Sequence, residues 1–194
     1  MSNIKTETLE AQIRECFGRV VYSHKTHEKA ADIILSKLST LKLWQIILSA
    51  ITTGGIITEL TKIGNLGNAG AIVAAITSTI LLAINTYSKD VNLGELGQKH
   101  KDAASKLWGI RESYFSLLTD IRTGDVNEEL IRKRRDELQS ELNAIYDSTP
   151  ATNSKAYSQA QRALKVNEEL TFSDHEIDVF LPEKLRKTGT KDSP

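Results

Sequence analysis

Two uncharged apolar runs constrain the fold of this chain more strongly than any other feature of its sequence. They cover residues 43–57 and 69–84, and the turn between them holds one acidic and one basic residue. A membrane-spanning helix needs roughly 20 mostly apolar residues, with about 17 as a lower limit, and each run reaches that length with its polar flanks. We therefore predict a transmembrane helical hairpin over residues 41–87. The alternative interpretation is a helical hairpin buried at the centre of a soluble bundle.

Aromatic and basic residues at one end of the hairpin predict its orientation. Trp44 opens the first run and Tyr87 closes the second, at the depth where amphipathic rings prefer to lie. Lysines gather at the same end, whereas the turn has one. The positive-inside rule then places both termini in the cytoplasm and the hairpin in the inner (cell) membrane. The predicted membrane-interface residues are Trp44, Tyr87, Lys42 and Lys89.

Small and hydroxylated side chains line both runs. Gly, Ala and Ser at spacings of three and four let helix backbones approach closely in lipid, and hydroxyl groups form hydrogen bonds between helices. We predict that these residues pack helices together or, with Gln45, face a lumen. One two-span hairpin has too little surface to enclose a pore, so conduction requires a homo-oligomer. The predicted helix-packing or lumen residues are Gln45, Gly54, Gly55, Gly67, Gly70, Ala71, Ala74, Ala75, Thr77 and Ser78.

The segments on both sides of the hairpin have helical periodicity. Apolar residues recur at helical spacing through residues 6–40, and a second seam with 3–4 spacing runs through residues 93–121. No strand alternation of useful length occurs, and prolines stand only at 150, 182 and 194, so the predicted class is all-α. We expect the first helix to enter the hairpin without a break and the second span to continue as a long helix. The two extensions then pack as an antiparallel cytoplasmic stalk or bundle. Its first turns after the hairpin bend or separate, because Gly94, Gly97 and His100 are weak coiled-coil residues.

This pattern predicts four parts: an N-terminal cytoplasmic helix (1–40), the transmembrane hairpin (41–87), a cytoplasmic helical region (88–187) and a disordered tail (188–194). Within the third part, Gly124 is a helix stop signal. Further helices are expected over residues 127–147 and from 154 to about 169. Ser173 and Glu176, three positions apart, form a capping box that starts a short last helix.

Two sets of residues admit a ligand-binding interpretation. The basic run from Arg132 to Arg135 suits a lipid head group or a nucleotide phosphate, although a solvated face with ion pairs, such as Arg132 with Asp136, is the more usual arrangement. His24 and His27 lie one helical turn apart, as metal ligands do, but no Cys motif or carboxylate accompanies them. We interpret the two histidines as a partly exposed polar edge of the apolar stripe, and we place the four histidines of the chain on different elements.

Composition and motifs exclude several classes of function. The 25 basic and 25 acidic residues give zero net charge, which disfavours nucleic acid as a direct partner. A single cysteine, Cys16, rules out an intrachain disulfide framework and is expected in the core. The sequence has no glycine-rich phosphate loop, no metalloprotease motif and no nucleophile with a recognisable base. We expect no enzyme, no cofactor and no metal.

Four segments give the chain a resemblance to a known family. The order of N-terminal helix, glycine-rich hairpin and helical region, together with residues 107–114, 135–142, 154–164 and 172–186, resembles the SLATT family of two-span effectors found beside nucleotide-signal synthases. The last two segments are similar to a subgroup found beside reverse transcriptases. The resemblance implies an oligomeric membrane effector of antiviral defence. A cytoplasmic sensor or signal-producing partner triggers such an effector to form a pore or disrupt the membrane, and growth arrest or cell death follows.

Two other hypotheses remain open on the sequence. The chain is also compatible with a non-conducting helical module, membrane-anchored or soluble, that scaffolds a partner sensor. The third hypothesis is a nucleotide receptor that uses the face from Arg132 to Arg135.

Overall fold

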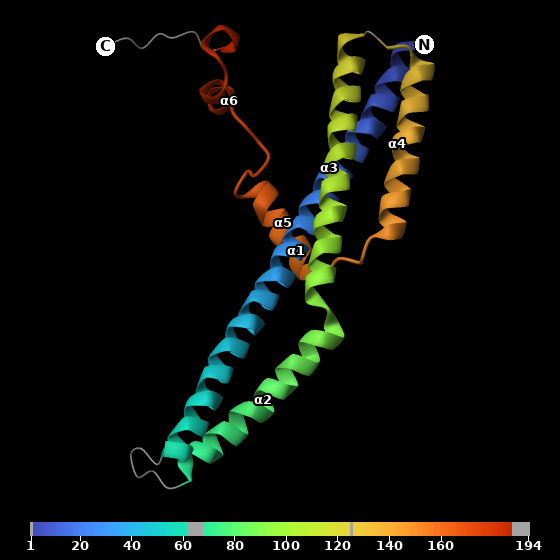
Figure 1. The fold of residues 1–194 in the computed structure, drawn as a ribbon. Helices are drawn as coiled ribbons and strands as arrows, with labels where there is room; N and C mark the ends of the chain where they lie inside the picture. The colour runs from blue at the N-terminus through green and yellow to red at the C-terminus, as the bar shows by residue number, and fades with distance from the viewer. Residues whose placement is uncertain (1, 62–67, 125, 188–194) are drawn as a thin grey trace, which may run out of the picture.

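The computed structural model describes residues 2–61, 68–124 and 126–187, and every regular element in them is a helix, which confirms the all-α prediction. Figure 1 shows a long, narrow molecule with the hairpin at one end and a bundle at the other. The predicted tail (188–194) and Gly67 lie outside the described residues. The helices are α1 (Ser2–Thr61), α2 (Ala69–Val91), α3 (Leu93–Thr123), α4 (Glu128–Ser148), α5 (Ser154–Lys165), α6 (Asp174–Phe180) and a 3-10 turn (Glu183–Leu185).

Helix α1 is the axis of the molecule. Its 60 residues extend about 90 Å at 1.5 Å per residue, and α2, α3, α4 and α5 all pack against it. No proline interrupts this segment, so the helix of the stalk passes directly into the first apolar run. The predicted unbroken entry into the hairpin is confirmed.

The second span does not continue without interruption. Asn92 adopts a left-handed backbone conformation (φ 40°, ψ 53°), which ends α2, and its side-chain oxygen accepts a hydrogen bond from the Glu95 backbone amide at the start of α3. Asn is one of the few residues that adopt this conformation readily. The predicted continuation of the second span as one long helix is therefore wrong, and the break lies at Asn92, just before the turns in which the sequence predicts a bend or separation. Gly97 lies inside α3, where a Cβ would come within 2.6 Å of the Leu35 side chain, so this glycine permits close helix contact.

The hydrophobic core lies between α1, α3 and α4, at the end of the molecule away from the hairpin. We call this three-helix region the stalk. The stripe on α1 meets the seam on α3 as predicted, and α4 covers the groove between them (Figure 1). Cys16 is buried in this core as expected. Its buried side chains are Leu9, Ile13, Cys16, Val20, Leu107, Ile110, Tyr114, Leu117, Ile131, Leu138 and Leu142.

Capping residues fix the ends of the shorter helices. Gly124 ends α3 with φ 78°, and Asn127 and Asn153 cap α4 and α5 by accepting backbone hydrogen bonds. The predicted capping box at the start of α6 is present, with Ser173 and Glu176 bonded reciprocally. α5 crosses α1, and α6 then stands apart from the stalk (Figure 1).

Candidate functional site: the membrane hairpin and its polar junction

The two apolar runs lie on the surface of the chain. In the most apolar 18-residue windows of the two arms, 11% and 6% of the residues are buried, with mean hydropathy of 1.3 and 1.8. A hairpin at the centre of a soluble bundle would bury most of these side chains. Fifteen large apolar residues from Leu43 to Val91 instead face outward, more than a third exposed. In length and composition both arms suit a bilayer.

The arms of the hairpin come closest at two glycines. A Cβ built on Gly55 would lie 2.7 Å from the carbonyl oxygen of Gly70, and a Cβ on Gly70 would lie 2.7 Å from that of Gly55. Ala74, one turn further along α2, is buried against Gly55. Backbone approach of this kind is how small residues join helices in lipid.

Polar groups within the hairpin are paired between the arms. Thr52 and Thr77 share a hydrogen bond of 2.7 Å between their hydroxyl oxygens. Nearer the stalk, the Gln45 side-chain amide donates to Asn85 Oδ1 at 2.9 Å. Gln45 thus joins α1 to α2 within the chain.

The remaining small residues face away from the partner arm. Gly54 has no neighbour within 4 Å of an added Cβ, and Ala71, Ala75 and Ser78 are exposed on α2. The structure therefore separates the predicted set into an inner face, which holds Gly55, Gly70, Ala74 and Thr77, and an outer row on α2, which holds Ala71, Ala75 and Ser78.

The predicted interface residues lie together at the stalk end of the hairpin. Trp44 and Tyr87 are both exposed, as are Lys42 and Lys89. Lys37, one turn closer to the stalk, donates a 2.6 Å hydrogen bond to the Tyr87 hydroxyl and lies 5.0 Å from its ring centre. An aromatic ring joined to an ammonium group suits the boundary between hydrocarbon and water.

Three histidines meet between α1 and α3, on the stalk side of the hairpin. His27 and His100 are hydrogen-bonded through their Nδ1 atoms at 3.0 Å, and His24 Nδ1 donates to the Ala104 carbonyl oxygen at 2.9 Å. All three are buried. The predicted partly exposed edge is wrong: His24 and His27 are buried, because the register of α1 against α3 brings His100 opposite His27. The histidines occupy α1, α3 and α6, and the packing of α1 on α3 brings three of them together. Within the described residues, no group of three or more His, Cys, Asp or Glu side chains is arranged for a metal ion.

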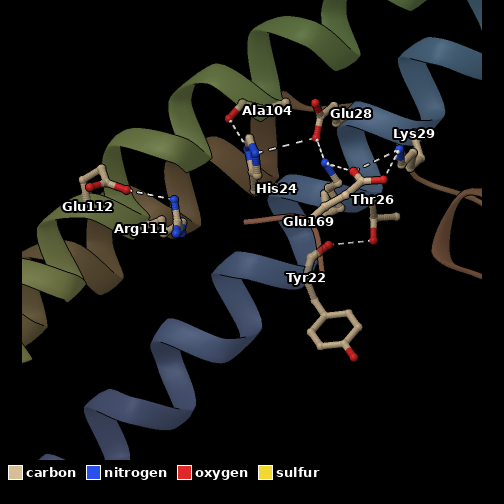
Figure 2. Close-up of polar contacts among 10 residues, drawn as sticks. Tyr22, His24, Thr26, Glu28, Lys29, Ala104, Arg111, Glu112 and Glu169 are labelled. Atoms are coloured by element: carbon tan, nitrogen blue, oxygen red, sulfur yellow. Dashed lines mark hydrogen bonds and ion pairs between the residues drawn. The ribbon is translucent and has the colours of Figure 1, made fainter. Parts of the chain in front are cut away.

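A buried lysine in the same turns of α1 ties the C-terminal segment to the stalk. Lys25 Nζ lies 2.7 Å from Glu28 and 2.6 Å from Glu169, which follows α5. Lys29 lies 3.4 Å from the same Glu169 carboxylate. Figure 2 shows Glu169 reaching Lys29 of α1, with His24 beside Glu28. We call His24, His27, His100, Lys25, Glu28 and Glu169 the polar junction.

Burial and charge shift the pKa values at this junction in two directions. Burial, assisted by the neighbouring His100 and His24, lowers the pKa of His27 to about 4, so the hydrogen-bonded pair is neutral. The hydrogen bond from Lys25 lowers the pKa of Glu169 to about 2. Burial opposes the charge on Lys25, but its bonds to Glu169 and Glu28 outweigh that effect and raise its pKa. The junction holds neutral rings beside a fully charged ion pair.

The basic run on α4 is paired with acidic neighbours. Arg132 bonds to Glu128, one turn earlier, and not to the predicted Asp136, which pairs with Arg135 instead. Arg134 lies 3.0 Å from Glu137, and Arg135 bonds to Asp136 and to Gln12 of α1. These contacts describe a solvated face that also holds α4 against α1.

This arrangement of a stalk and two long exposed apolar arms defines a class, the all-α membrane proteins with a two-span hairpin. A family model described as SMODS and SLOG-associating 2TM effector domain family 4 matches residues 9–176, most of the chain. The chain belongs to that family, which confirms the resemblance to the SLATT family and makes it a membrane effector of defence systems. The subgroup found beside reverse transcriptases stays a prediction. A search of curated proteins and a search of solved structures gave no match.

Proposed function

We propose that this effector assembles through its hairpin in the inner (cell) membrane and forms a pore or disrupts the bilayer, causing growth arrest or cell death. The observation that carries the proposal is the outer row on α2. Ala71, Ala75 and Ser78 follow helical spacing and are exposed in the single chain, while the inner face already joins α1 to α2. A second hairpin is the partner that such a row suits, because small residues let two helices approach closely in lipid.

The proposed orientation has both termini in the cytoplasm. Lys37, Lys42 and Lys89 lie at the stalk end of the hairpin, and the positive-inside rule assigns that end to the cytoplasm. A cytoplasmic sensor or signal-producing partner would then reach the stalk. We propose no enzymatic step, and no nucleic acid as a direct partner.

Substitution in the outer row tests this function. Ala75→Leu places a large side chain in the proposed contact between copies. Ala83→Leu is the matched control, because Ala83 is also exposed on α2 but lies about 80° around the helix from Ala75, at 100° per residue. We expect wild type and the control to collapse the membrane potential, followed with a potential-sensitive dye, and to arrest growth when expressed under activating conditions. Ala75→Leu should do neither.

The competing function is a non-conducting scaffold for a partner sensor, favoured by the exposed apolar side chains Val179 and Phe180 of α6. Two results would support it over the effector function. One is an unchanged membrane potential in activated cells expressing the wild-type chain. The other is recovery of the chain as a monodisperse soluble protein after fractionation without detergent.

A further inference from the structure

A cavity of about 400 Å³ opens where α1, α4 and α5 meet, beside the polar junction. Its wall on α1 is made by Tyr22, Ser23, Thr26 and His27, and Tyr146 of α4 and Tyr157 of α5 close two further sides. The linker at residues 149–152 completes the rim. The volume falls within the range of about 300 to 1,000 Å³ that is usual for small-molecule sites.

Aromatic rings from three separate helices converge on this cavity. The rings of Tyr22 and Tyr157 are stacked, with centres 6.0 Å apart and planes at 27°. Tyr146 and Tyr157 remain 40% and 50% exposed, although tyrosine gains free energy from burying its ring. Figure 2 shows the Tyr22 ring pointing away from the ion pairs of the junction. The cavity thus presents aromatic surface that the chain leaves partly uncovered.

The polar groups of the cavity are hydroxyls. Ser23 Oγ and Tyr146 Oη lie 2.8 Å apart, with either able to donate, and Thr26 donates to the Tyr22 carbonyl oxygen. Among the described residues that line the cavity, none is Asp, Glu, Lys or Arg. A phosphate or carboxylate inside it would meet no cationic side chain among the described lining residues. An acyl chain would make no use of the hydrogen-bonding capacity that the Ser23 and Tyr146 hydroxyl groups retain beyond their mutual bond. Aromatic rings can stack on the face of a flat molecule, and hydroxyl groups can form hydrogen bonds with polar atoms at its edge. The cavity therefore suits a planar molecule with polar edge atoms.

We propose that this cavity binds a planar, uncharged heteroaromatic ring, stacked on the tyrosines and hydrogen-bonded at its edge to Ser23 and the Tyr146 hydroxyl. The site goes beyond the membrane function and does not depend on pore formation. The position of the cavity connects it, through side-chain contacts, to the helices that enter the hairpin. His27 lines the cavity and is hydrogen-bonded to His100 of α3, so a ligand that contacts His27 is one side chain away from the α1–α3 contact above the membrane arms.

The test is titration of the full chain in detergent micelles with adenosine, followed by calorimetry and saturation-transfer NMR. Ribose is the non-aromatic control probe. Tyr157→Ala removes one stacking ring, and because Tyr157 is half exposed this variant should fold normally. Phe115→Ala is the matched control, since Phe115 is also exposed but lines a different hollow on the stalk. Tyr157→Phe keeps the ring and loses the hydroxyl.

We expect wild type, Phe115→Ala and Tyr157→Phe to bind adenosine with similar affinity, and Tyr157→Ala to bind about tenfold more weakly or worse. Titration with adenosine monophosphate distinguishes two kinds of ligand that could supply the ring, a free base or nucleoside and a nucleotide. Equal binding of both probes points to a free base or nucleoside, and tighter binding of the monophosphate, still lost in Tyr157→Ala, points to a nucleotide held by its base. The proposal is overturned if adenosine does not bind, if ribose binds as well, or if Tyr157→Ala binds adenosine like wild type.

Discussion

Gly55 and Gly70 occupy each other's side-chain space: a Cβ on either would lie 2.7 Å from the backbone oxygen of the other. Gly54, the immediate neighbour of Gly55, has open space instead. Two adjacent glycines in one apolar run therefore have different structural roles. The difference determines which face of α1 packs against α2. It thereby also determines which small residues of α2 remain exposed for contact with another molecule.

Gly70→Ala should weaken the hairpin, and Gly54→Ala should not. The added methyl on residue 70 meets backbone, which cannot move as a side chain can, so we expect a loss of about 1 to 3 kcal/mol. Gly54→Ala adds a methyl in open space and should be neutral or stabilise α1 slightly, because alanine favours helix. Thermal unfolding in detergent, followed by circular dichroism, measures both. Equal effects of the two substitutions would contradict the observed packing of α1 on α2.

Leu107→Ala should destabilise the stalk strongly. Leu107 is fully buried between α1 and α3, and truncating a buried leucine to alanine removes about 2 to 5 kcal/mol of stability. Leu130→Ala makes the same chemical change at a site on α4 that is 52% exposed, where less than about 0.5 kcal/mol is expected. Chemical denaturation of the two variants in parallel gives the comparison. A small loss of stability in Leu107→Ala would show that Leu107 is not part of the hydrophobic core.

Lys25→Ala should release the C-terminal segment. The substitution removes a buried ammonium that lies between Glu28 and Glu169 and leaves Lys29 as the cation near Glu169. We expect a loss of about 2 kcal/mol, less than for a fully buried pair because Glu169 is one-third exposed. Amide hydrogen exchange should accelerate in α5.

The matched control for this contact is Lys99→Ala. Lys99 lies 2.8 Å from Glu95, but both side chains are more than half exposed, and such pairs contribute little. Its unfolding temperature and its exchange rates in α5 should equal those of wild type. Unchanged exchange of α5 in Lys25→Ala would show that other contacts anchor this helix.

Acid should destabilise the stalk in two separate pH ranges. The pKa of His27 is about 4 in the folded chain and 6.5 without burial, so the unfolded state binds the proton first. The stabilisation is therefore complete above pH 6.5 and is lost as the pH falls toward 4, by about 2 to 3 kcal/mol. Glu169, with a pKa of about 2 against 4.5, contributes stability above pH 4.5 that is lost between 4.5 and 2.

Denaturant titrations at half-unit pH steps measure this profile. His27→Asn should reduce the loss between pH 6.5 and 4 to the part that His100 contributes, because burial also lowers the pKa of His100, and it should leave the lower range in place. His175→Asn, which removes an exposed histidine on α6, should retain both ranges. A wild-type stability that stays constant from pH 7 to pH 4 would rule out a buried neutral His27.

Local sequence determined much of this protein. The length and apolarity of two runs specify the hairpin, and their helical periodicity specifies which stripe of α1 and which seam of α3 are buried. Capping chemistry located Ser173 and Gly124, because a cap involves residues a few positions apart. The break at Asn92 was not predicted, since asparagine also occurs within helices, and its left-handed conformation here is fixed by the packing of α2 and α3 on α1.

Only the tertiary structure decided which faces meet. Spacing along a helix gives a stripe but does not give its register against another helix, so neither the distinction between Gly54 and Gly55 nor the pairing of His27 with His100 follows from either segment alone. The contact of Lys25 with Glu169 joins residues 144 positions apart. It depends on α5 crossing α1 at that turn, and therefore on the three-dimensional path of the whole chain.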